Sequence, residues 1–200
     1  MTSIIDYGAG NLFSVKNALD YLDIPSVITN EKSIIGQSDK MILPGVGAFP
    51  DAMKMLNAAG LTGFIKEQSK QKPLLGICLG MQILFEKGFE FGETEGLGLL
   101  GGSVIKMMPK GLKIPHMGWN SLVKLNECPL LSGVPENSYV YFVHSYRAET
   151  PDDAIAAYTE YGERIPALVF KDKVFGAQFH PEKSGNTGLK ILKNFGELAI

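Results

Sequence analysis

Residues 73–82, P-L-L-G-I-C-L-G-M-Q, carry the strongest structural signal in the chain. Two leucines begin it in the manner of a strand, and the residues from Met81 to Phe85 become amphipathic, so the pattern predicts a strand, a tight turn and a helix. Cys78 stands between two glycines, as a very sharp strand-to-helix turn requires. Its side chain would then lie at the carboxyl end of a strand and at a helix N-terminus, where thiolate is favoured over thiol.

This placement suggests that Cys78 is a nucleophile. The N–H of Leu79, at the start of the helix, could face an oxyanion formed by attack on a carbonyl. A structural cysteine buried in an apolar run is the other interpretation. The stretch alone leaves both open.

The chain on the N-terminal side of the turn alternates between strands and helices. Strands are predicted at 3–5, 26–29 and 40–43, and helical patterns follow the first and third of them. Such alternation predicts an α/β fold with a mostly parallel sheet flanked by helices, in which ligands collect at the carboxyl ends of the strands. The turns at 7–10 and 45–47 and the one at Cys78 should share that edge.

The C-terminal part has a different character. A glycine-rich segment at 86–102 gives too little periodicity to assign, and six short strands are predicted between 103 and 179, with a hairpin turn at Asp172. A helix at 188–198 closes the chain. With no linker or internal repeat, residues 1–200 are predicted to form a single domain, an α/β core with an additional β-rich part.

Composition narrows the class of protein. The net charge of −2 and the 20% of charged residues give no sign of a nucleic-acid or membrane surface. The only cysteines are Cys78 and Cys128, the latter interpreted as structural, so a reducing, cytoplasmic setting is expected. The absence of a signal peptide and of an apolar run long enough for a bilayer fits this expectation.

The sequence contains no HExxH motif and no paired-cysteine motif for zinc, so neither a metal nor a cofactor is expected.

Two further motifs leave alternatives open. Gly8-Ala9-Gly10 invites a dinucleotide-binding interpretation, but the third glycine of that fingerprint would fall at Phe13. A cysteine nucleophile also needs a base, and His180 is the best placed, because it follows a strand and precedes Glu182, whose carboxylate could orient it. His144 also ends a strand and remains possible by spacing.

The G-I-C-L-G-M-Q turn together with H-P-E at 180–182 resembles the class I, triad-type glutamine amidotransferases, which have a flavodoxin-like fold. The blocks D-Y-G-A-G-N, P-G-V-G-A-F, H-M-G-W-N, Y-F-V-H-S-Y and H-P-E-K-S extend the resemblance along the whole chain. They resemble the branch of the family that hydrolyses glutamine for histidine biosynthesis.

The resemblance implies a role for each matching residue. Cys78 would be the nucleophile, His180 the base and Glu182 the orienting carboxylate. The residues implied to hold the oxyanion or the substrate glutamine are Val46, Gly47, Leu79, Gln82, Glu90, Ser145 and Tyr146. Without the resemblance, Gln82 would be interpreted as a solvated helix residue and Tyr146 as a half-buried aromatic.

The resemblance also implies a heterodimer. The ammonia would pass to a (βα)8-barrel cyclase that makes imidazole glycerol phosphate, and Asn11, Trp119 and Lys183 would face this partner. Trp119, the only tryptophan, could alternatively be a core residue. Glutamine hydrolysis in this branch is slow until the cyclase is bound, and the loop at 45–47 is the expected place for that control.

Three competing functions share parts of the pattern. Another triad glutaminase subunit would carry the same triad but different partner-facing blocks. A binding module on the same fold would typically lack a triad residue. A cysteine peptidase or thioesterase with the same turn would act without any dependence on glutamine.

Overall fold

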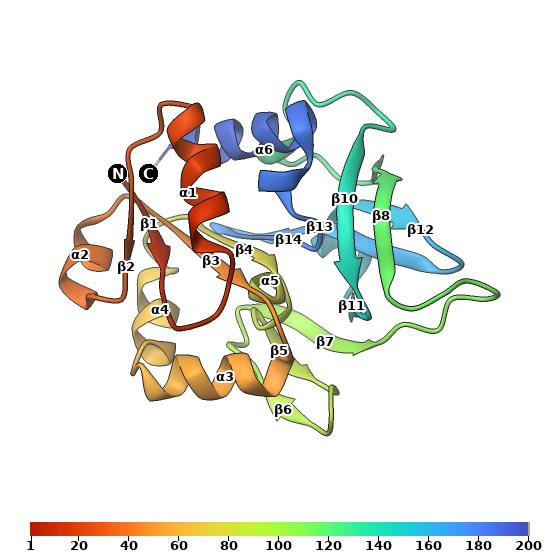
Figure 1. Cartoon of the computed structure of the whole chain (residues 1–200), viewed down its shortest axis with the longest axis horizontal. Helices are drawn as coiled ribbons and strands as arrows, with labels where there is room; N and C mark the ends of the chain where they lie inside the picture. Colours follow the sequence, from red (N-terminus) through yellow and green to blue (C-terminus); the bar gives the residue numbers. More distant parts are fainter. Residues whose placement is uncertain (200) are drawn as a thin grey trace.

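An eight-stranded mixed sheet forms the centre of the molecule (Figure 1). The computed structural model describes residues 1–199. The order of the sheet is β2-β1-β3-β4-β14-β13-β12-β9; the first five strands are parallel and the last three are antiparallel. The strands are β1 (Thr2–Ile5), β2 (Ser26–Thr29), β3 (Lys40–Gly45), β4 (Leu74–Cys78), β9 (Val123–Lys124), β12 (Ile155–Glu160), β13 (Arg164–Lys171) and β14 (Val174–Ala177).

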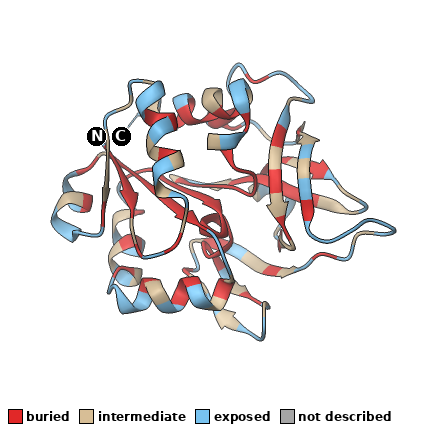
Figure 2. Cartoon of the chain, viewed as in Figure 1, coloured by how far each residue is buried: buried red, intermediate tan, exposed pale blue. Residues whose placement is uncertain are grey.

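Helices cover both faces of the parallel half of this sheet. Ile4 faces the core formed with α1 and α6, whereas the next residue, Ile5, faces the core under α2, α3 and α4, as alternating side chains of a strand require. Both cores consist of buried side chains (Figure 2). The helices are α1 (Leu12–Tyr21), α2 (Lys32–Gln37), α3 (Phe49–Ala58), α4 (Thr62–Gln68), α5 (Leu79–Gln82) and α6 (Gly185–Glu197).

The β-rich part forms two smaller sheets beside the central one. A two-stranded ribbon pairs β8 with β10, and a four-stranded sheet has the order β11-β7-β5-β6. Its elements are β5 (Phe85–Gly88), β6 (Thr94–Glu95), β7 (Leu100–Lys106), β8 (His116–Ser121), β10 (Tyr139–His144) and β11 (Tyr146–Glu149), and the 3-10 helices are η1 (Pro129–Leu131), η2 (Asp152–Ala154) and η3 (Pro181–Lys183). In residues 1–199, no helix is long and apolar enough to cross a membrane.

The predicted fold class is confirmed, including the parallel sheet, the flanking helices, and the hairpin at Asp172, whose φ is +53°. The predicted helix through Phe85 is wrong in length. It ends at Gln82, and Phe85 instead pairs with Leu100 as the start of β5. Residues 81–85 are all buried, so their pattern reflects burial on every side and not one face of a helix.

One of the six short strands predicted between 103 and 179 spans 121–125, but the structure has β8 ending at Ser121 and a separate two-residue β9. The sequence H-M-G-W-N-S of β8 lacks the β-branched residues that mark a strand, and its pairing with β10 is a tertiary effect.

Candidate active site

The turn after β4 places Cys78 in a strained backbone conformation. Cys78 has φ +54° and ψ −112°, outside the regions that non-glycine residues ordinarily occupy. A Cβ at Gly76 would lie 2.6 Å from the carbonyl oxygen of Gly80, and a Cβ at Gly80 would lie 1.8 Å from that of Leu43. The two glycines are therefore required by close packing of β3, β4 and α5, and the predicted sharp turn is present.

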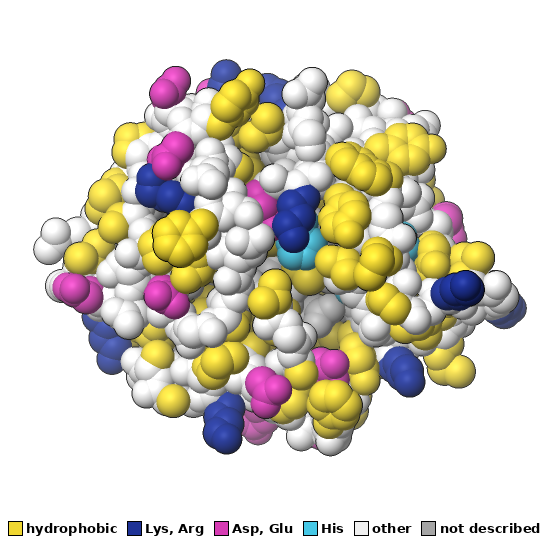
Figure 3. All heavy atoms as spheres, viewed as in Figure 1, with side chains coloured by type: hydrophobic (Ala, Val, Ile, Leu, Met, Phe, Trp, Pro, Cys, Tyr) yellow, Lys and Arg dark blue, Asp and Glu magenta, His cyan; other side chains and the backbone are white. Residues whose placement is uncertain are grey.

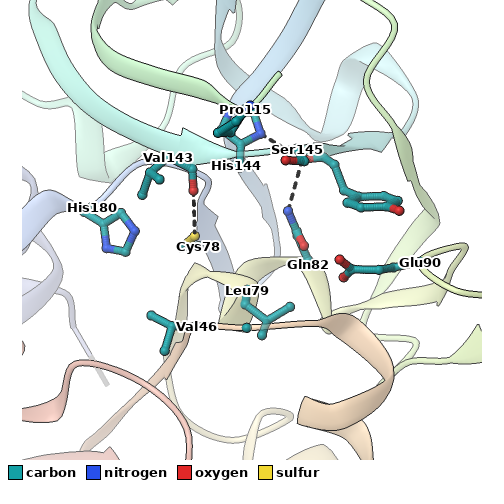
Figure 4. A pocket seen from close by; sticks show the side chains of 12 residues that line it. Val46, Cys78, Leu79, Gln82, Glu90, Pro115, Val143, His144, Ser145 and His180 are labelled. Carbon is teal, nitrogen blue, oxygen red and sulfur yellow. Dashed lines mark hydrogen bonds between the residues drawn. The ribbon is translucent and has the colours of Figure 1, made fainter. Parts of the chain in front are cut away.

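His180 and Glu182 lie beside this turn on the loop between β14 and α6. Nδ1 of His180 is 2.8 Å from Oε1 of Glu182, and the two side chains are 4% and 1% exposed. The backbone N–H of His180 donates to the Tyr141 carbonyl, and the Ser184 hydroxyl donates to the backbone carbonyl of His180. Because Glu182 occupies Nδ1, the free Nε2 is left for the Cys78 side (Figure 4).

The charge state of His180 is set by its two neighbours. Burial alone would lower the pKa of His180, but the interactions with Cys78 and with the Glu182 carboxylate together outweigh burial and raise this pKa to about 9. At neutral pH the imidazole therefore carries a proton next to the sulfur. This is the arrangement of a nucleophile beside a proton carrier and an orienting carboxylate.

A cavity of about 360 Å³ opens in front of Cys78. Its size falls in the range of small-molecule sites. Figure 4 shows Cys78, His180 and Gln82 among the side chains that project into it. The lining residues are Val46, Gly47, Cys78, Leu79, Gln82, Glu90, Pro115, Val143, His144, Ser145, Tyr146 and His180.

All seven residues predicted for the oxyanion or the substrate line this cavity. Leu79 is the first residue of α5, where N–H groups lack intrahelical partners. Val46 and Gly47 form an exposed loop after β3, and Gly47 has φ +104° with open space where a Cβ would lie. This loop can therefore present backbone groups to the cavity without steric hindrance.

Two polar side chains of the cavity, Gln82 and Glu90, are already hydrogen-bonded to the protein. Nε2 of Gln82 donates to the Tyr146 carbonyl at 3.1 Å, and Gln82 is buried, so its interpretation as a solvated residue is wrong. Oε2 of Glu90 accepts the N–H of Phe49 at 2.8 Å, at the start of α3. Burial and the nearby Glu90 charge both raise the pKa of Tyr146.

The open question of the base is answered by the surroundings of His144. Nδ1 of His144 is 2.8 Å from the Tyr146 carbonyl oxygen, and its Nε2 is 3.0 Å from Nδ1 of His116. Burial and the charges of both other histidines lower the pKa of His144 to about 3. Both nitrogens are thus engaged away from Cys78, and His144 does not fit the role of base.

The sequence did not reveal two groups that contact the sulfur. Nε2 of Gln178 lies 3.9 Å from Sγ of Cys78, and the thiol lies 3.9 Å from the Val143 carbonyl oxygen. Gln178 also accepts from Nε2 of Gln82 at 3.0 Å. Gln178 follows β14 directly, at the sheet edge that carries Cys78, and this position after a predicted parallel strand could have marked it as a candidate site residue.

The three residues predicted to face a partner lie outside the cavity and near the protein surface. Asn11 caps α1 by accepting from the N–H of Ser14, and Lys183 is exposed on η3. Trp119 is 56% exposed, so its interpretation as a core residue is wrong.

Trp119 belongs to the outer face of the β8–β10 ribbon, where Trp119 pairs with Tyr141 and Met117 with Val143. Met117, Trp119 and Tyr139 are all more than half exposed. Figure 3 shows hydrophobic side chains gathered over this part of the molecule. Exposed apolar groups of this extent are typical of a surface that binds another protein.

Cys128 is buried beside η1, and burial raises the pKa of its thiol to about 11. Within residues 1–199, no three His, Cys, Asp or Glu side chains come together in a way that could hold a metal ion.

The fold and the strained cysteine beside a histidine and a carboxylate define a class of protein. The sequence model of the family "Glutamine amidotransferase class-I" matches residues 3–198, and the chain belongs to this family, within which it is a subunit of the imidazole glycerol phosphate synthase HisH type.

The second part of that assignment rests on relatives of nearly equal length. The chain is 56% identical to "Imidazole glycerol phosphate synthase subunit HisH" of Caldanaerobacter subterraneus subsp. tengcongensis, covering 99% of this chain and 98% of the relative. It is 52% identical to the protein of the same name from Bacillus cereus strain ATCC 14579, covering 98% and 93%. The predicted family and its histidine-biosynthesis branch are confirmed, and the chain is an enzyme subunit of the glutaminase kind.

Solved structures agree with the fold. The structure of PurLQS from Thermotoga maritima has a TM-score of 0.73 at 22% identity, covering 97% of this chain and 96% of that one. A crystal structure described as a glutamine amidotransferase has a TM-score of 0.75 at 20% identity, covering 97% and 98%.

Proposed function

We propose that this chain hydrolyses glutamine through Cys78, His180 and Glu182 and delivers the ammonia to a cyclase partner that makes imidazole glycerol phosphate. The observation that carries the proposal is the strained Cys78. It lies at the carboxyl end of β4, beside a protonated His180 that Glu182 orients. The family shares this chemistry, and the identity of about half over the full chain supports its transfer.

In the first half of the reaction, the Cys78 sulfur adds to the γ-amide carbonyl carbon of glutamine. The N–H of Leu79 and the backbone at Val46 and Gly47 hold the oxyanion. His180 then gives its proton to the departing nitrogen, which leaves as ammonia, and a thioester to Cys78 remains. The raised pKa of His180 suits this step, because the proton is present at neutral pH.

In the second half, water attacks the thioester, and His180, now neutral, takes the proton from that water. The second tetrahedral intermediate collapses to glutamate and the free sulfur. Glu182 keeps the tautomer and orientation of the imidazole throughout, because it holds Nδ1 at 2.8 Å. No step uses a metal or a cofactor.

The substrate would lie along the wall formed by Val143 to Tyr146. Ser145 and Tyr146 offer backbone and hydroxyl groups, and Glu90 offers the carboxylate that suits the α-ammonium of an amino acid. Gln82 lies between this wall and Gln178, so it controls the position of both. These are the groups we assign to recognition of glutamine.

We assign the outer face of the β8–β10 ribbon, with Asn11 and Lys183 nearby, to the cyclase. Its exposed Met117, Trp119 and Tyr139 suit the apolar centre of an interface, where aromatic anchors carry most of the binding energy. The partner is expected to be a (βα)8 barrel, as in the family, and the complex to act in the cytoplasm. The exposed loop at Val46 and Gly47 is the part of the active site on which docking could act.

The test is release of glutamate from glutamine by the purified chain, alone and together with the cyclase and its nucleotide ligand. We expect strong activation by the partner and its loss in Cys78→Ala. Ammonium salts should still support the cyclase in the presence of the Cys78→Ala chain, which shows that the loss lies in the release of ammonia from glutamine and not in the cyclase reaction.

Absence of glutamate release by the wild-type complex would overturn the proposed function. Activation by the partner subunit of another glutaminase, with none by the histidine-pathway cyclase, would support the proposed triad but contradict the proposed partner. Hydrolysis of peptides or thioesters without glutamine dependence would favour the peptidase or thioesterase alternative.

A further inference from the structure

Two buried histidines of the β8–β10 ribbon take no part in the chemistry proposed above. His116 and His144 face each other across the two strands, on the inner face of the ribbon, and their exposed fractions are 2% and 6%. Nδ1 of His116 lies 3.0 Å from Nε2 of His144. Buried histidines without an assigned role call for a physical explanation.

The contacts fix the hydrogen positions on both rings. The Tyr146 carbonyl oxygen, 2.8 Å from Nδ1 of His144, can only accept, so this nitrogen carries the hydrogen. In a neutral ring Nε2 of His144 must then accept, and it takes the Nδ1–H of His116. Nε2 of His116 accepts in turn from the side-chain amide of Asn120 at 3.4 Å.

The hydrogen bonds thus run in one direction, from Asn120 through His116 and His144 to the Tyr146 carbonyl. We call these groups the histidine relay. Burial lowers the pKa of both rings, to about 4 for His116 and about 3 for His144, so both are neutral at physiological pH, as this order requires.

The relay ends on the wall of the active-site cavity. The Tyr146 carbonyl also accepts from Nε2 of Gln82, which in turn donates to Gln178 beside the Cys78 sulfur. Between His144, the last residue of β10, and Tyr146, the first of β11, the chain passes from the ribbon to the four-stranded sheet. The relay bonds the two sides of that corner to each other.

The other end of the relay is held rigidly. The His116 ring is stacked between Phe142 at 4.7 Å and Tyr161 at 4.0 Å, with interplanar angles of 22° and 23°. The Asn120 amide also donates to the Glu160 carbonyl at 3.0 Å, which anchors it to β12. Because the His116 ring is fixed on both faces, its Nδ1–H has a fixed position, and the hydrogen bond to it holds the His144 ring in place.

We propose that His116 and His144 are positioning residues for glutamine, which set the place of the Tyr146 carbonyl and hence of the wall from Val143 to Tyr146 that faces Cys78. The inference rests on the proposed function. Neither histidine touches the reacting atoms, so the relay should act on the binding of glutamine more than on the chemical step.

The test compares His116→Phe with His116→Asn in the complex with the cyclase. Phenylalanine keeps a ring between Phe142 and Tyr161 but removes both nitrogens, whereas the asparagine amide restores a donor near Nδ1 without the ring. We expect His116→Phe to raise the KM for glutamine about tenfold, the loss of one hydrogen bond of ordinary strength, with kcat changed less than about threefold.

The asparagine variant separates positioning from packing. His116→Asn should recover most of the wild-type KM while its Tm falls below that of His116→Phe, because it lacks the stacked ring. A purely structural role would give the opposite order, with KM following Tm. A wild-type KM in His116→Phe would overturn the inference. Cyclase activity with ammonium salts should equal wild type in both variants.

A second measurement keeps the inference testable if a variant fails to fold. Nitrogen-15 NMR of the wild-type chain, labelled at histidine, should show two neutral rings at pH 7 that both carry hydrogen on Nδ1. An Nε2–H tautomer or a protonated ring at either position would overturn the relay. These spectra do not depend on turnover, so a wild-type complex that releases no glutamate would reject the proposed function without deciding this result.

Discussion

His180 and His144 are buried to nearly the same extent, yet their charge states are opposite. The pKa of His180 is raised to about 9, whereas that of His144 is lowered to about 3. Burial disfavours the charged imidazole in both cases. Cys78 and Glu182 favour the charged form of His180 strongly enough to outweigh burial, whereas the ring nitrogens of His144 contact a carbonyl and a second neutral histidine, and burial prevails. The partners, and not the depth of burial, decide which histidine can carry a proton to a leaving group.

The largest expected effect separates these two histidines by activity. His180→Asn removes the proton carrier and should lower kcat/KM for glutamine by about 10³ or more. His144→Asn keeps a donor for the Tyr146 carbonyl and should keep kcat within about tenfold of wild type. Both are measured as glutamate release in the cyclase complex. Equal losses of kcat in the two variants would contradict the different roles assigned to the two histidines, and ammonium-supported cyclase activity shows that the cyclase itself is intact in each assay.

The second prediction concerns the carboxylate that makes His180 different. Glu182→Gln keeps a hydrogen-bond acceptor but removes the negative charge, so the pKa of His180 should fall. In the wild type, activity should decline above about pH 9, as His180 loses its proton, and this decline should begin at lower pH in the variant. We expect kcat/KM to drop about 10²-fold at neutral pH.

A pH profile of kcat/KM for wild type and variant checks this prediction. An unchanged alkaline limit in Glu182→Gln would mean that Glu182 does not tune His180, whatever the loss in rate.

The surroundings of His180 can be predicted from the sequence better than those of His144. Gly76, Cys78 and Gly80 indicate the turn by their spacing, because only close backbone packing demands two glycines there. His180 and Glu182 are neighbours along the chain, so their contact is local. These features, together with the alternating strands and helices, are sufficient for the fold class and for bringing the triad together.

The His144 side depends on contacts between distant residues. His116 and His144 are 28 positions apart and meet only because β8 pairs with β10. Gln178 reaches Cys78 across 100 positions. No local pattern encodes such pairings, and the strands of the smaller sheet escape detection in the glycine-rich segment before β7 for the same reason.

The third prediction compares the two sites on opposite sides of neutral pH. The folded-state pKa values of His116 and His144 lie below the unfolded value near 6.5, so their contribution to stability is complete above that pH and is lost as pH falls toward 4 and 3. At pH 5, this loss should be about 2 kcal/mol for each histidine. His180, with a raised pKa, stabilises fully below pH 6.5 and loses its contribution as pH rises through about 9.

Urea unfolding at acid, neutral and alkaline pH, about pH 5, 7 and 10, measures both effects. His116→Phe should remove about half of the acid loss of stability, because His144 remains, and should leave the alkaline side unchanged. His180→Asn should remove the alkaline loss and leave the acid side unchanged. An acid loss of stability that persists fully in His116→Phe would contradict the origin assigned to it.

The smallest effect concerns a buried polar group that, unlike both histidines, lacks a partner. Thr159 of β12 is fully buried next to Glu160, whose carbonyl holds the outer end of the histidine relay, and in the part of the chain that the structure describes its hydroxyl makes no hydrogen bond. Valine has nearly the same shape and no hydroxyl, so Thr159→Val should raise the free energy of unfolding by up to about 1 kcal/mol. For a domain of this size, Tm should rise about 2–4 °C.

Thr159→Ser is the matched control, because it keeps the hydroxyl but loses a methyl group and should destabilise the fold. If Thr159→Val destabilises instead, the hydroxyl has a partner in solution, such as a buried water. The conclusion drawn from the two histidines would then extend to Thr159, because its partner, and not its depth of burial, would decide whether the buried hydroxyl stabilises the fold.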